Sequence, residues 1–320
     1  HTKMSGEVEP ASELTPELRA FIEFVAKKGR ELYRDLPWRR TYDPYAIWIS
    51  EVMLQQTQVS RVDGRWQRWL ERFPTVDALA AAAPSDVLEE WQGLGYNRRA
   101  LSVHRAAQAI SEAGGVFPQD SKELVKLPGI GPATAAGIRA FAFNLHGVYL
   151  ETNVRTVFLH ELYPQAEGVP DSELVPLVEL TCPASVADAV NADSATNVVD
   201  ADGAANDVTA ELTPRSWYYA LLDYGAYLKK TIPNPSRRSK SHVKQSRFEG
   251  SHRQKRAELL RVLLAHKDEG GAVFETLHQE LCQIEVNAGR ETLDEQVTLG
   301  LLEELAKEGF CQKNDEYWLP

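Results

Sequence analysis

Cysteine is scarce in this chain, with Cys182, Cys282 and Cys311 the only three among 320 residues. They stand too far apart for the paired spacing of a zinc or iron–sulfur site, and three do not make a disulfide framework. No apolar run approaches the roughly 20 residues that cross a bilayer. These absences argue against a disulfide-stapled or membrane-embedded protein, and we expect a reducing, cytoplasmic location.

Positive charge is also in deficit, since 35 Lys and Arg face 46 Asp and Glu for a net charge of -11. Taken as an average, this balance argues against a nucleic-acid partner. The distribution of the charge, however, favours such a partner. Residues 229–261 hold eleven basic residues and two acids, which gives a local net charge of +9 against -20 in the rest of the chain. A local basic face is what phosphate contact requires, and an ordinary solvated charge run is the alternative.

Apolar residues recur with helical spacing through most of the first half of the chain. The predicted helices cover residues 18–33, 44–57, 59–73, 76–82, 84–92, 98–113, 121–126 and 134–143. The pattern predicts an all-α fold, and the 320 residues suffice for two helical cores and a smaller module.

The composition changes after residue 180. Residues 181–213 hold six acids and no Lys, Arg or aromatic residue, which predicts a solvated insertion. Residues 229–250 are basic and contain two prolines, which predicts an extended strap. Helical patterns at 252–266, 273–282 and 293–307, followed by alternation at 310–319, predict a winged-helix-like module. Such modules bind partners or DNA more often than they do chemistry, and a structural cap is the alternative.

These patterns predict three domains. The first is a six-helix domain at 44–149 that contains a helix-hairpin-helix, and the third is the module at 251–320. The second combines 11–43 with 150–250 and carries both the insertion and the strap.

A glycine-punctuated turn, Leu127-Pro-Gly-Ile-Gly-Pro-Ala-Thr-Ala135, lies between two of the predicted helices. Its proline and glycines give a tight turn whose amides lead into a helix N-terminus, where a phosphate is received. The expected DNA contacts in the turn are Leu127, Gly129, Gly131 and Thr134, and we expect a monovalent cation to bind there. Any helix-loop-helix needs glycines in its turn, so this motif alone does not decide the function.

Four other motifs, taken together with the turn, do indicate a function. They are Pro37-Trp-Arg39, Trp48-Ile-Ser-Glu-Val-Met-Leu-Gln-Gln-Thr-Gln58, Gly93-Leu-Gly-Tyr-Asn97 and Leu150-Glu-Thr-Asn-Val-Arg155. In this order and spacing the chain resembles the helix-hairpin-helix (HhH-GPD) DNA glycosylases, most closely those of the MutY type, strongly over 32–163 and weakly over 217–228. The resemblance implies a nucleoid-associated, monomeric base-excision-repair hydrolase. It would flip a mispaired or damaged purine, with adenine the expected base, out of double-stranded DNA and cut its N-glycosidic bond.

Two carboxyl groups would divide this chemistry. Glu51 has apolar neighbours that should raise its pKa, and by resemblance it would protonate a ring nitrogen of the flipped base. Glu151, beside Asn153, would stabilise the positive sugar, but the family has aspartate at this position. The extra methylene moves the carboxylate by about a bond length, and catalysis is sensitive to shifts on the order of 1 Å. The alternatives are a rebuilt pocket, a different substrate, or a Glu151 that only caps the following helix.

The resemblance also implies residues that fill the hole left by the flipped nucleotide and residues that line the base pocket. The first group is Gln55, Gln56, Gln58 and Tyr96, and the second is Arg39, Trp48 and Ala133. A solvated helix face for the glutamines and a core position for Tyr96 are the alternatives.

Two further positions depart from relatives. Bifunctional enzymes of the endonuclease III type have at position 133 a lysine that forms a Schiff base and nicks the strand. Ala133 has no amine, so we predict that water attacks and an abasic site remains. MutY-type proteins follow the helix at 217–228 with four cysteines that hold an iron–sulfur cluster, starting where this chain has Lys229. None of the four is present, so we predict no iron–sulfur cluster, no other metal site and no cofactor besides the monovalent cation at the hairpin.

In place of the cluster loop, the basic strap is expected to hold DNA through Arg237, Arg238 and Lys240. Two other functions stay open. One is a glycosylase for another base, such as hypoxanthine, an alkylated purine or a mispaired pyrimidine. The other is a lesion-binding protein with weak or no catalysis. The tail does not resemble the Nudix-like domain that senses oxidised guanine in MutY proteins, so the sequence does not fix the opposite base.

Overall fold

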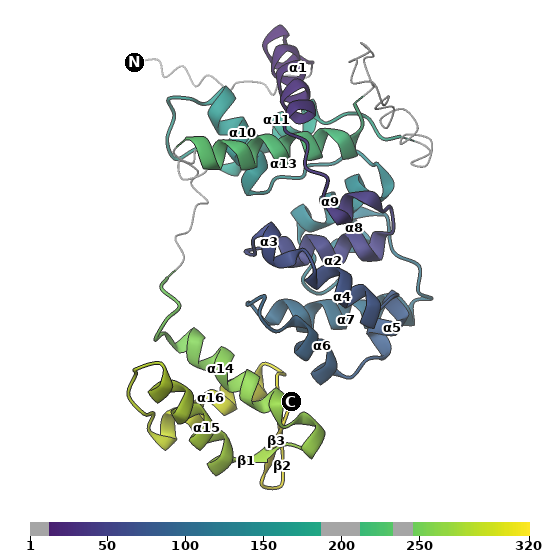
Figure 1. The fold of residues 1–320 in the computed structure, drawn as a ribbon. Coiled ribbons are helices and arrows are strands. Elements are labelled where there is room, and N and C mark those ends of the chain that lie inside the picture. The colour runs from purple at the N-terminus through teal and green to yellow at the C-terminus, as the bar shows by residue number, and fades with distance from the viewer. Residues whose placement is uncertain (1–12, 187–211, 233–245) are drawn as a thin grey trace, which may run out of the picture. The chain divides into compact units, whose positions relative to one another are not determined.

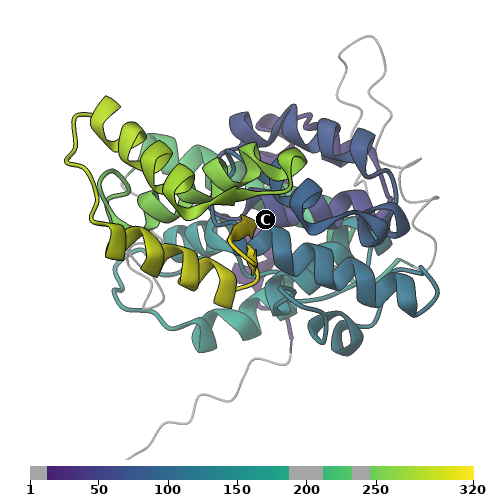
Figure 2. The same cartoon turned by 90° about the horizontal axis from the view of Figure 1, so that it is seen from below.

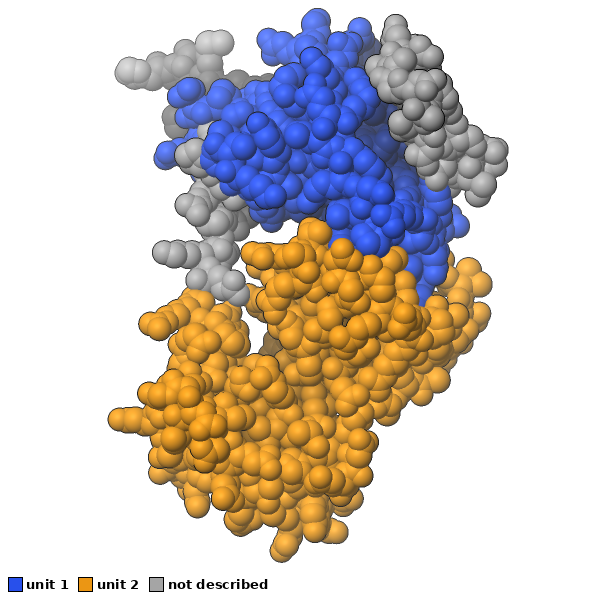
Figure 3. All heavy atoms as spheres, viewed as in Figure 1, with its two compact units in different colours: residues 1–51, 118–126, 130–243 blue, residues 52–117, 127–129, 244–320 orange. Residues whose placement is uncertain are grey.

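The computed structural model describes residues 13–186, 212–232 and 246–320 and divides the chain into two compact units (Figures 1 and 3). Unit 1 comprises residues 1–51, 118–126 and 130–243, and unit 2 comprises 52–117, 127–129 and 244–320. Helices dominate both units and the described strands are two or three residues long, which confirms the all-α prediction.

Unit 1 is built around one long helix, α13, which packs against α1 and α10 (Figure 1). Close approach is possible because glycines lie at both contacts. A Cβ at Gly29 of α1 would come within 2.3 Å of the Cβ of Ala220, and one at Gly225 within 2.4 Å of the carbonyl oxygen of Asn153. The described elements of unit 1 are α1 Pro16–Glu31, η1 Pro37–Arg40, most of α2 Pro44–Leu54, α8 Ser121–Val125, α9 Pro132–Phe143, α10 Thr152–Leu162, α11 Asp171–Thr181 and α13 Pro214–Thr231.

Unit 2 begins with short helices where the sequence predicted one long helix at 59–73. Gly64 interrupts that helix with a φ of 91°, and the side chain of Gln67 accepts its amide proton at 2.7 Å. The helical elements of this part are α3 Val59–Val62, α4 Arg65–Arg72, α5 Val76–Ala81, α6 Pro84–Trp91 and α7 Arg98–Glu112.

The C-terminal module of unit 2 has the element order of a winged helix. Its elements are α14 His252–Ala265, η3 Lys267–Glu269, β1 Ala272–Val273, α15 Phe274–Asn287, α16 Glu295–Lys307, β2 Gln312–Asn314 and β3 Tyr317–Leu319. The strands form an antiparallel sheet in the order β1-β3-β2, with Trp318 opposite both Ala272 and Lys313. Strands β2 and β3 form a hairpin, and the C-terminus follows directly after β3 (Figure 2). The sequence predicted the β2–β3 pair but missed β1, because two residues carry no readable alternation.

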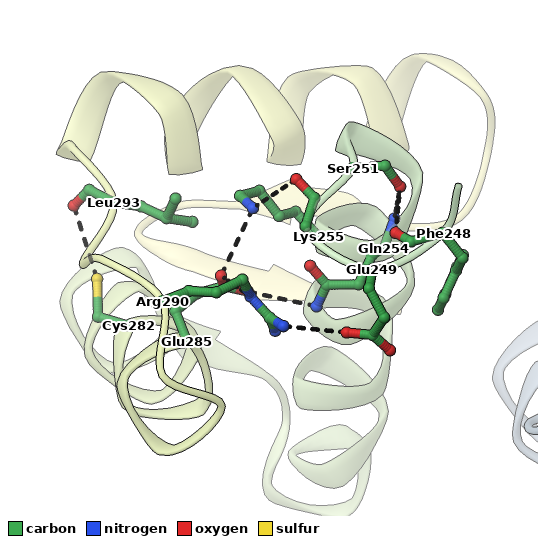
Figure 4. A network of polar contacts seen from close by, with 10 residues as sticks. Phe248, Glu249, Ser251, Gln254, Lys255, Cys282, Glu285, Arg290 and Leu293 are labelled. Atoms are coloured by element: carbon green, nitrogen blue, oxygen red, sulfur yellow. Dashed lines mark hydrogen bonds and ion pairs between the residues drawn. The ribbon is translucent and has the colours of Figure 1, made fainter. Parts of the chain in front are cut away.

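A buried carboxylate organises the inside of this module (Figure 4). Glu285 is 0% exposed and accepts hydrogen bonds from Arg290 Nε at 2.6 Å and from Gln254 Nε2 at 3.3 Å, with Lys255 Nζ at 3.5 Å. Burial opposes ionisation, but these partners hold the pKa of Glu285 below its usual value. Its oxygens are used within the module, so this acid is structural.

Ion pairs attach the module to the helices that precede it within unit 2. Lys267 pairs with Asp86 at 2.8 Å and with Glu89 at 2.9 Å, both on α6. Glu308, just after α16, accepts from Arg256 of α14 and from Arg98 at the start of α7.

Candidate active site

Glu51 lies on α2, whose residues Ile47 and Trp48 are fully packed into the core. Burial raises the pKa of Glu51 to about 7. A hydrogen bond from Tyr149 acts against the rise, the charge of Glu151 adds to it, and the charge of Arg39 lowers it. The raised pKa that the sequence predicted for Glu51 is therefore present. A carboxyl group with this pKa is partly protonated at neutral pH and is able to act as an acid.

Tyr149 is the partner of Glu51, and the sequence did not predict it. Its hydroxyl donates to Glu51 Oε2 at 2.7 Å across 98 positions of the chain. Burial also raises the pKa of Tyr149 well above its ordinary value, so the phenol keeps its proton. The one available signal was its place two residues before Glu151, the spacing that puts two side chains on one side of an extended segment.

Gly137 on α9 makes room for this pair. A Cβ at Gly137 would come within 2.8 Å of Glu51 Oε2 and within 2.9 Å of Tyr149 Cε2. Real Cβ atoms do not approach other atoms so closely, so a side chain here would displace the carboxyl group or the ring. The glycine therefore fixes where the two groups can meet.

Glu151 is the N-cap of α10, with Oε1 accepting the amide of Val154 at 2.8 Å. Burial raises the pKa of Glu151, while the amides of Val154 and Asn153 and the charges of Lys229 and Arg155 lower it. Glu151 thus combines the capping role that the sequence left open with a set of partners that stabilise its ionised form. Glu51 and Glu151 are close enough for the charge of one to raise the pKa of the other.

The other proposed catalytic residue, Asn153, lies in the first turn of α10 beside α13. Its Oδ1 is buried and has no hydrogen-bond partner among the described residues. A buried acceptor without a donor is rare in native structures and is explained where a ligand or water supplies the proton.

Arg39 makes a bidentate ion pair with Asp223 of α13, with both N···O distances at 2.8 Å. Its guanidinium lies 4.3 Å from the ring centroid of Tyr219. Trp48 is 0% exposed. The structure thus shows Arg39 and Trp48 packed within unit 1. Their place in a base pocket stays a prediction. Asp223 was missed, although an acid in the apolar run around Leu221 and Tyr224 was a visible signal.

The hairpin leads into α9, which begins at Pro132 with Gly131 as N-cap and no side chain capping it. Ala133 presents only a methyl group at the second position of the helix, and Thr134 is buried. Gly129 has a φ of 75°, and a Cβ there would come within 2.7 Å of Ser102 Cβ, so the turn requires glycine. Leu127 is half-buried. Their contacts to DNA and to a cation stay predictions.

The three glutamines lie beyond a helix and not on its face. Helix α2 ends at Leu54, before the predicted residue 57, and Gln55, Gln56 and Gln58 are exposed in the turn that follows. Gln56, at φ 59°, and Tyr96, at φ 48°, both adopt the left-handed conformation. Tyr96 is 40% exposed and therefore is not a core aromatic. Left-handed backbone at non-glycine residues is uncommon. The contact of these residues with DNA stays a prediction.

Arg99, which the sequence did not single out, joins these two turns within unit 2. It donates to the carbonyl oxygen of Val52 at 2.8 Å and to that of Gly95 at 3.0 Å. Its guanidinium lies 5.6 Å from the ring centroid of Tyr96, and that of Arg253 from the C-terminal module lies 5.8 Å from the same ring. Burial lowers the pKa of Arg99 to about 10.

The predicted strap contacts Arg237, Arg238 and Lys240 lie outside the described residues, as do positions 187–211 of the acidic insertion. In the described ranges, no group of three or more His, Cys, Asp or Glu is arranged to hold a metal. The three cysteines are free, and three thiols do not supply the four ligands of a four-cysteine cluster. Among the described helices, none has the length and apolarity needed to span a membrane.

Known proteins resemble a part of the chain. An adenine DNA glycosylase of Mycolicibacterium smegmatis is 43% identical over 152 residues, covering 47% of this chain and 52% of the relative. One from Buchnera aphidicola is 40% identical over 127 residues, covering 39% and 36%, and the human one is 39% identical over 134 residues, covering 39% and 24%. The matches thus span about half or less of these curated relatives.

Among solved structures, a thermostable thymine-DNA glycosylase superposes with a TM-score of 0.52 at 20% identity, covering 68% of this chain and 90% of that one, which shows a shared fold. The family model described as "HhH-GPD superfamily base excision DNA repair protein" matches residues 49–209, half of the chain. The chain therefore belongs to the HhH-GPD superfamily of base excision DNA repair proteins.

Proposed function

We propose that this protein is a monomeric DNA glycosylase that removes adenine, mispaired or opposite a damaged base, from double-stranded DNA. One observation carries the proposal. Burial raises the pKa of Glu51 to about 7, so Glu51 can hold a proton at neutral pH. Burial also raises the pKa of the nearby Glu151, but the amides of Val154 and Asn153 and the charges of Lys229 and Arg155 act against that rise. The family and the adenine DNA glycosylases among its relatives support this choice of reaction and base.

In the proposed reaction, protonated Glu51 gives its proton to a ring nitrogen of the flipped adenine, and the bond from C1′ of the sugar to the base breaks. The electron pair leaves with the base, and the carboxylate of Glu151 stabilises the positive sugar. Water then adds to C1′ and its proton returns to Glu51, leaving an abasic site. In this proposal the unpartnered Oδ1 of Asn153 accepts a hydrogen bond from a sugar hydroxyl or from water.

An assay of base excision tests the proposed reaction directly. Duplexes with a panel of damaged and mismatched bases are incubated with the protein and then treated with alkali, which cleaves at abasic sites. Cleavage at adenine supports the proposal. Cleavage only at hypoxanthine, an alkylated purine or a pyrimidine would show that the protein is a glycosylase for that base and not for adenine. The glutamate at position 151 favours one further candidate, a lesion-binding protein, for which no duplex would be cleaved although damaged duplexes are bound.

The excision rate is expected to depend on pH with two limbs. Glu51 must be protonated, so the rate should fall as the pH rises through about 7. Glu151 must be ionised, so the rate should also fall at acid pH, where its raised pKa removes the charge. Single-turnover rates measured from acid to alkaline pH follow both limbs. A rate that keeps rising beyond about pH 8 would contradict the acid role of Glu51.

Borohydride is expected to trap no covalent complex between the protein and DNA, because Ala133 offers no amine for a Schiff base. The check is a denaturing gel of the reaction with and without borohydride. Lys229 is the control for a positive result, since it lies within electrostatic reach of Glu151 and burial lowers its pKa. A trapped band that Lys229→Ala removes would show lyase chemistry from this lysine.

We also infer that the protein holds no iron–sulfur cluster and that its basic strap contacts DNA instead. Changing Arg237, Arg238 and Lys240 to alanine should weaken binding to all duplexes about equally. The slope of log affinity against log salt should flatten by roughly one for each phosphate that the variant no longer neutralises. Fluorescence anisotropy at several salt concentrations measures both. A loss confined to one lesion would argue for base recognition by the strap.

A further inference from the structure

The two oxygens of the Glu51 carboxyl group are not equivalent. Oε2 accepts the hydroxyl proton of Tyr149 at 2.7 Å. Because burial keeps Tyr149 protonated, this hydroxyl is a permanent donor at neutral pH. A neutral carboxyl group carries its proton on one oxygen, and an oxygen that already faces a donor is the unfavourable place for it. The acidic proton of Glu51 therefore belongs on Oε1.

Tyr149 is held so that its hydroxyl cannot turn away. Its ring packs edge-on against Phe141, with centroids 5.3 Å apart, and against Tyr218, with centroids 5.4 Å apart. Its backbone amide donates to the hydroxyl of Tyr218 at 3.1 Å, and that hydroxyl donates in turn to the carbonyl oxygen of Gly147. Gly137 leaves the gap in which the tyrosine and the carboxyl group meet.

We propose that Tyr149 is a positioning residue for Glu51. Tyr149 directs the acidic proton to Oε1 and stabilises the carboxylate that remains after the proton has moved. This inference rests on the proposed function, in which Glu51 is the acid. In the chemical step the Oε1–H bond breaks and an N–H bond forms on the base. The hydrogen bond from Tyr149 then becomes charge-assisted and stronger. Burial alone would leave Glu51 a weaker acid, and the tyrosine acts against that effect.

The chain offers a matched control. Tyr224 of α13 is another buried tyrosine of unit 1 whose hydroxyl donates to a glutamate, Glu161 of α10. Tyr224→Phe removes the same hydroxyl from the same kind of pair, but Glu161 is not among the groups that shift Glu51. A general effect of losing a buried hydroxyl would appear in both variants, and an effect through Glu51 only in Tyr149→Phe.

The test compares wild type, Tyr149→Phe and Tyr224→Phe in single-turnover excision over the same pH range. In Tyr149→Phe we expect the alkaline limb to move up by about one pH unit, because a hydrogen bond to the charged form is removed. The rate at the optimum pH should fall by about tenfold, a part of what a general acid contributes. Tyr224→Phe should shift neither. An unmoved alkaline limb in Tyr149→Phe, or an equal shift in both variants, overturns the proposal.

A second measurement separates this inference from the proposed function. Carbon NMR of protein labelled at its glutamate carboxyl groups follows the pKa of Glu51 without any substrate, and Glu51→Gln identifies its signal. A rise in Tyr149→Phe alone supports the pairing even if no duplex is cleaved, in which case only the proposed function fails. An unchanged pKa overturns the pairing, whatever the activity. Thermal melts of both tyrosine variants confirm that the protein measured is folded.

Discussion

Glu51→Gln is expected to abolish excision while leaving affinity for duplex DNA within a few-fold of wild type. Glutamine keeps the shape of the side chain and an oxygen that can accept the hydroxyl of Tyr149, but it has no acidic proton to give. General acids contribute roughly 100-fold to 10,000-fold to a rate, so the loss should fall in that range. Single-turnover excision and a binding titration on the same adenine-containing duplex measure the two effects.

Glu23→Gln is a suitable control, because Glu23 is exposed on α1 and should leave both rate and affinity unchanged. If Glu51→Gln turned over at a rate comparable with wild type, the acid would have to be another group. If it lost affinity as much as rate, Glu51 would be a binding residue and not the acid.

Glu151→Gln is expected to lose about 2 kcal/mol or more of transition-state stabilisation, or roughly 30-fold in rate. The structure makes this substitution selective. The oxygen of glutamine can still accept the amide of Val154 and cap α10, so the change removes the charge and keeps the cap. Glu151→Asp should also be impaired, because aspartate caps and carries charge but its carboxylate lies closer to the backbone and farther from the sugar. Rates at the optimum pH, with melting temperatures beside them, separate chemistry from folding.

Thr152→Ser, a change at the exposed neighbour, is the control for this pair. Near-normal activity in Glu151→Gln would reduce Glu151 to a helix cap, and the positive sugar would need another partner. Better activity in Glu151→Asp than in wild type would mean that the pocket is not adapted to the longer side chain.

Much of the fold follows from local signals in the sequence. Helix α6 was predicted at 84–92 and spans Pro84–Trp91, because proline at its start and the apolar spacing that follows are both readable. The predictions were less accurate where a single glycine determines whether a helix ends, as at Gly64. A glycine within a helical pattern is compatible with a helix that continues and with one that breaks. They were also less accurate at chain reversals such as the end of α2, where no proline or glycine marks the last residue.

For the candidate site, Glu51 and the rise in its pKa could be predicted, because apolar neighbours on the same helix supply part of its surroundings. The pairing of Glu51 with Tyr149, 98 positions away, and the pairing of Arg39 with Asp223, across 184 positions, could not be predicted. Contacts of this kind depend on how α9, α10 and α13 pack, and no periodicity within one segment encodes them. Arg99 was missed for a related reason, since its partners are backbone carbonyl oxygens and leave no trace in residue type.

The carboxyl group of Glu51 also affects the folding equilibrium. Its pKa is about 7 in the folded protein against an ordinary value of 4.5, so the folded state binds this proton more tightly than the unfolded chain does. That contribution to the free energy of unfolding is complete below pH 4.5 and disappears as the pH rises through about 7. It amounts to about 3 kcal/mol at roughly 1.36 kcal/mol per pKa unit. At neutral pH, part of this contribution is lost, because Glu51 begins to ionise in a buried position. The free energy of unfolding is then expected to be lower than that of a variant with an uncharged side chain at position 51.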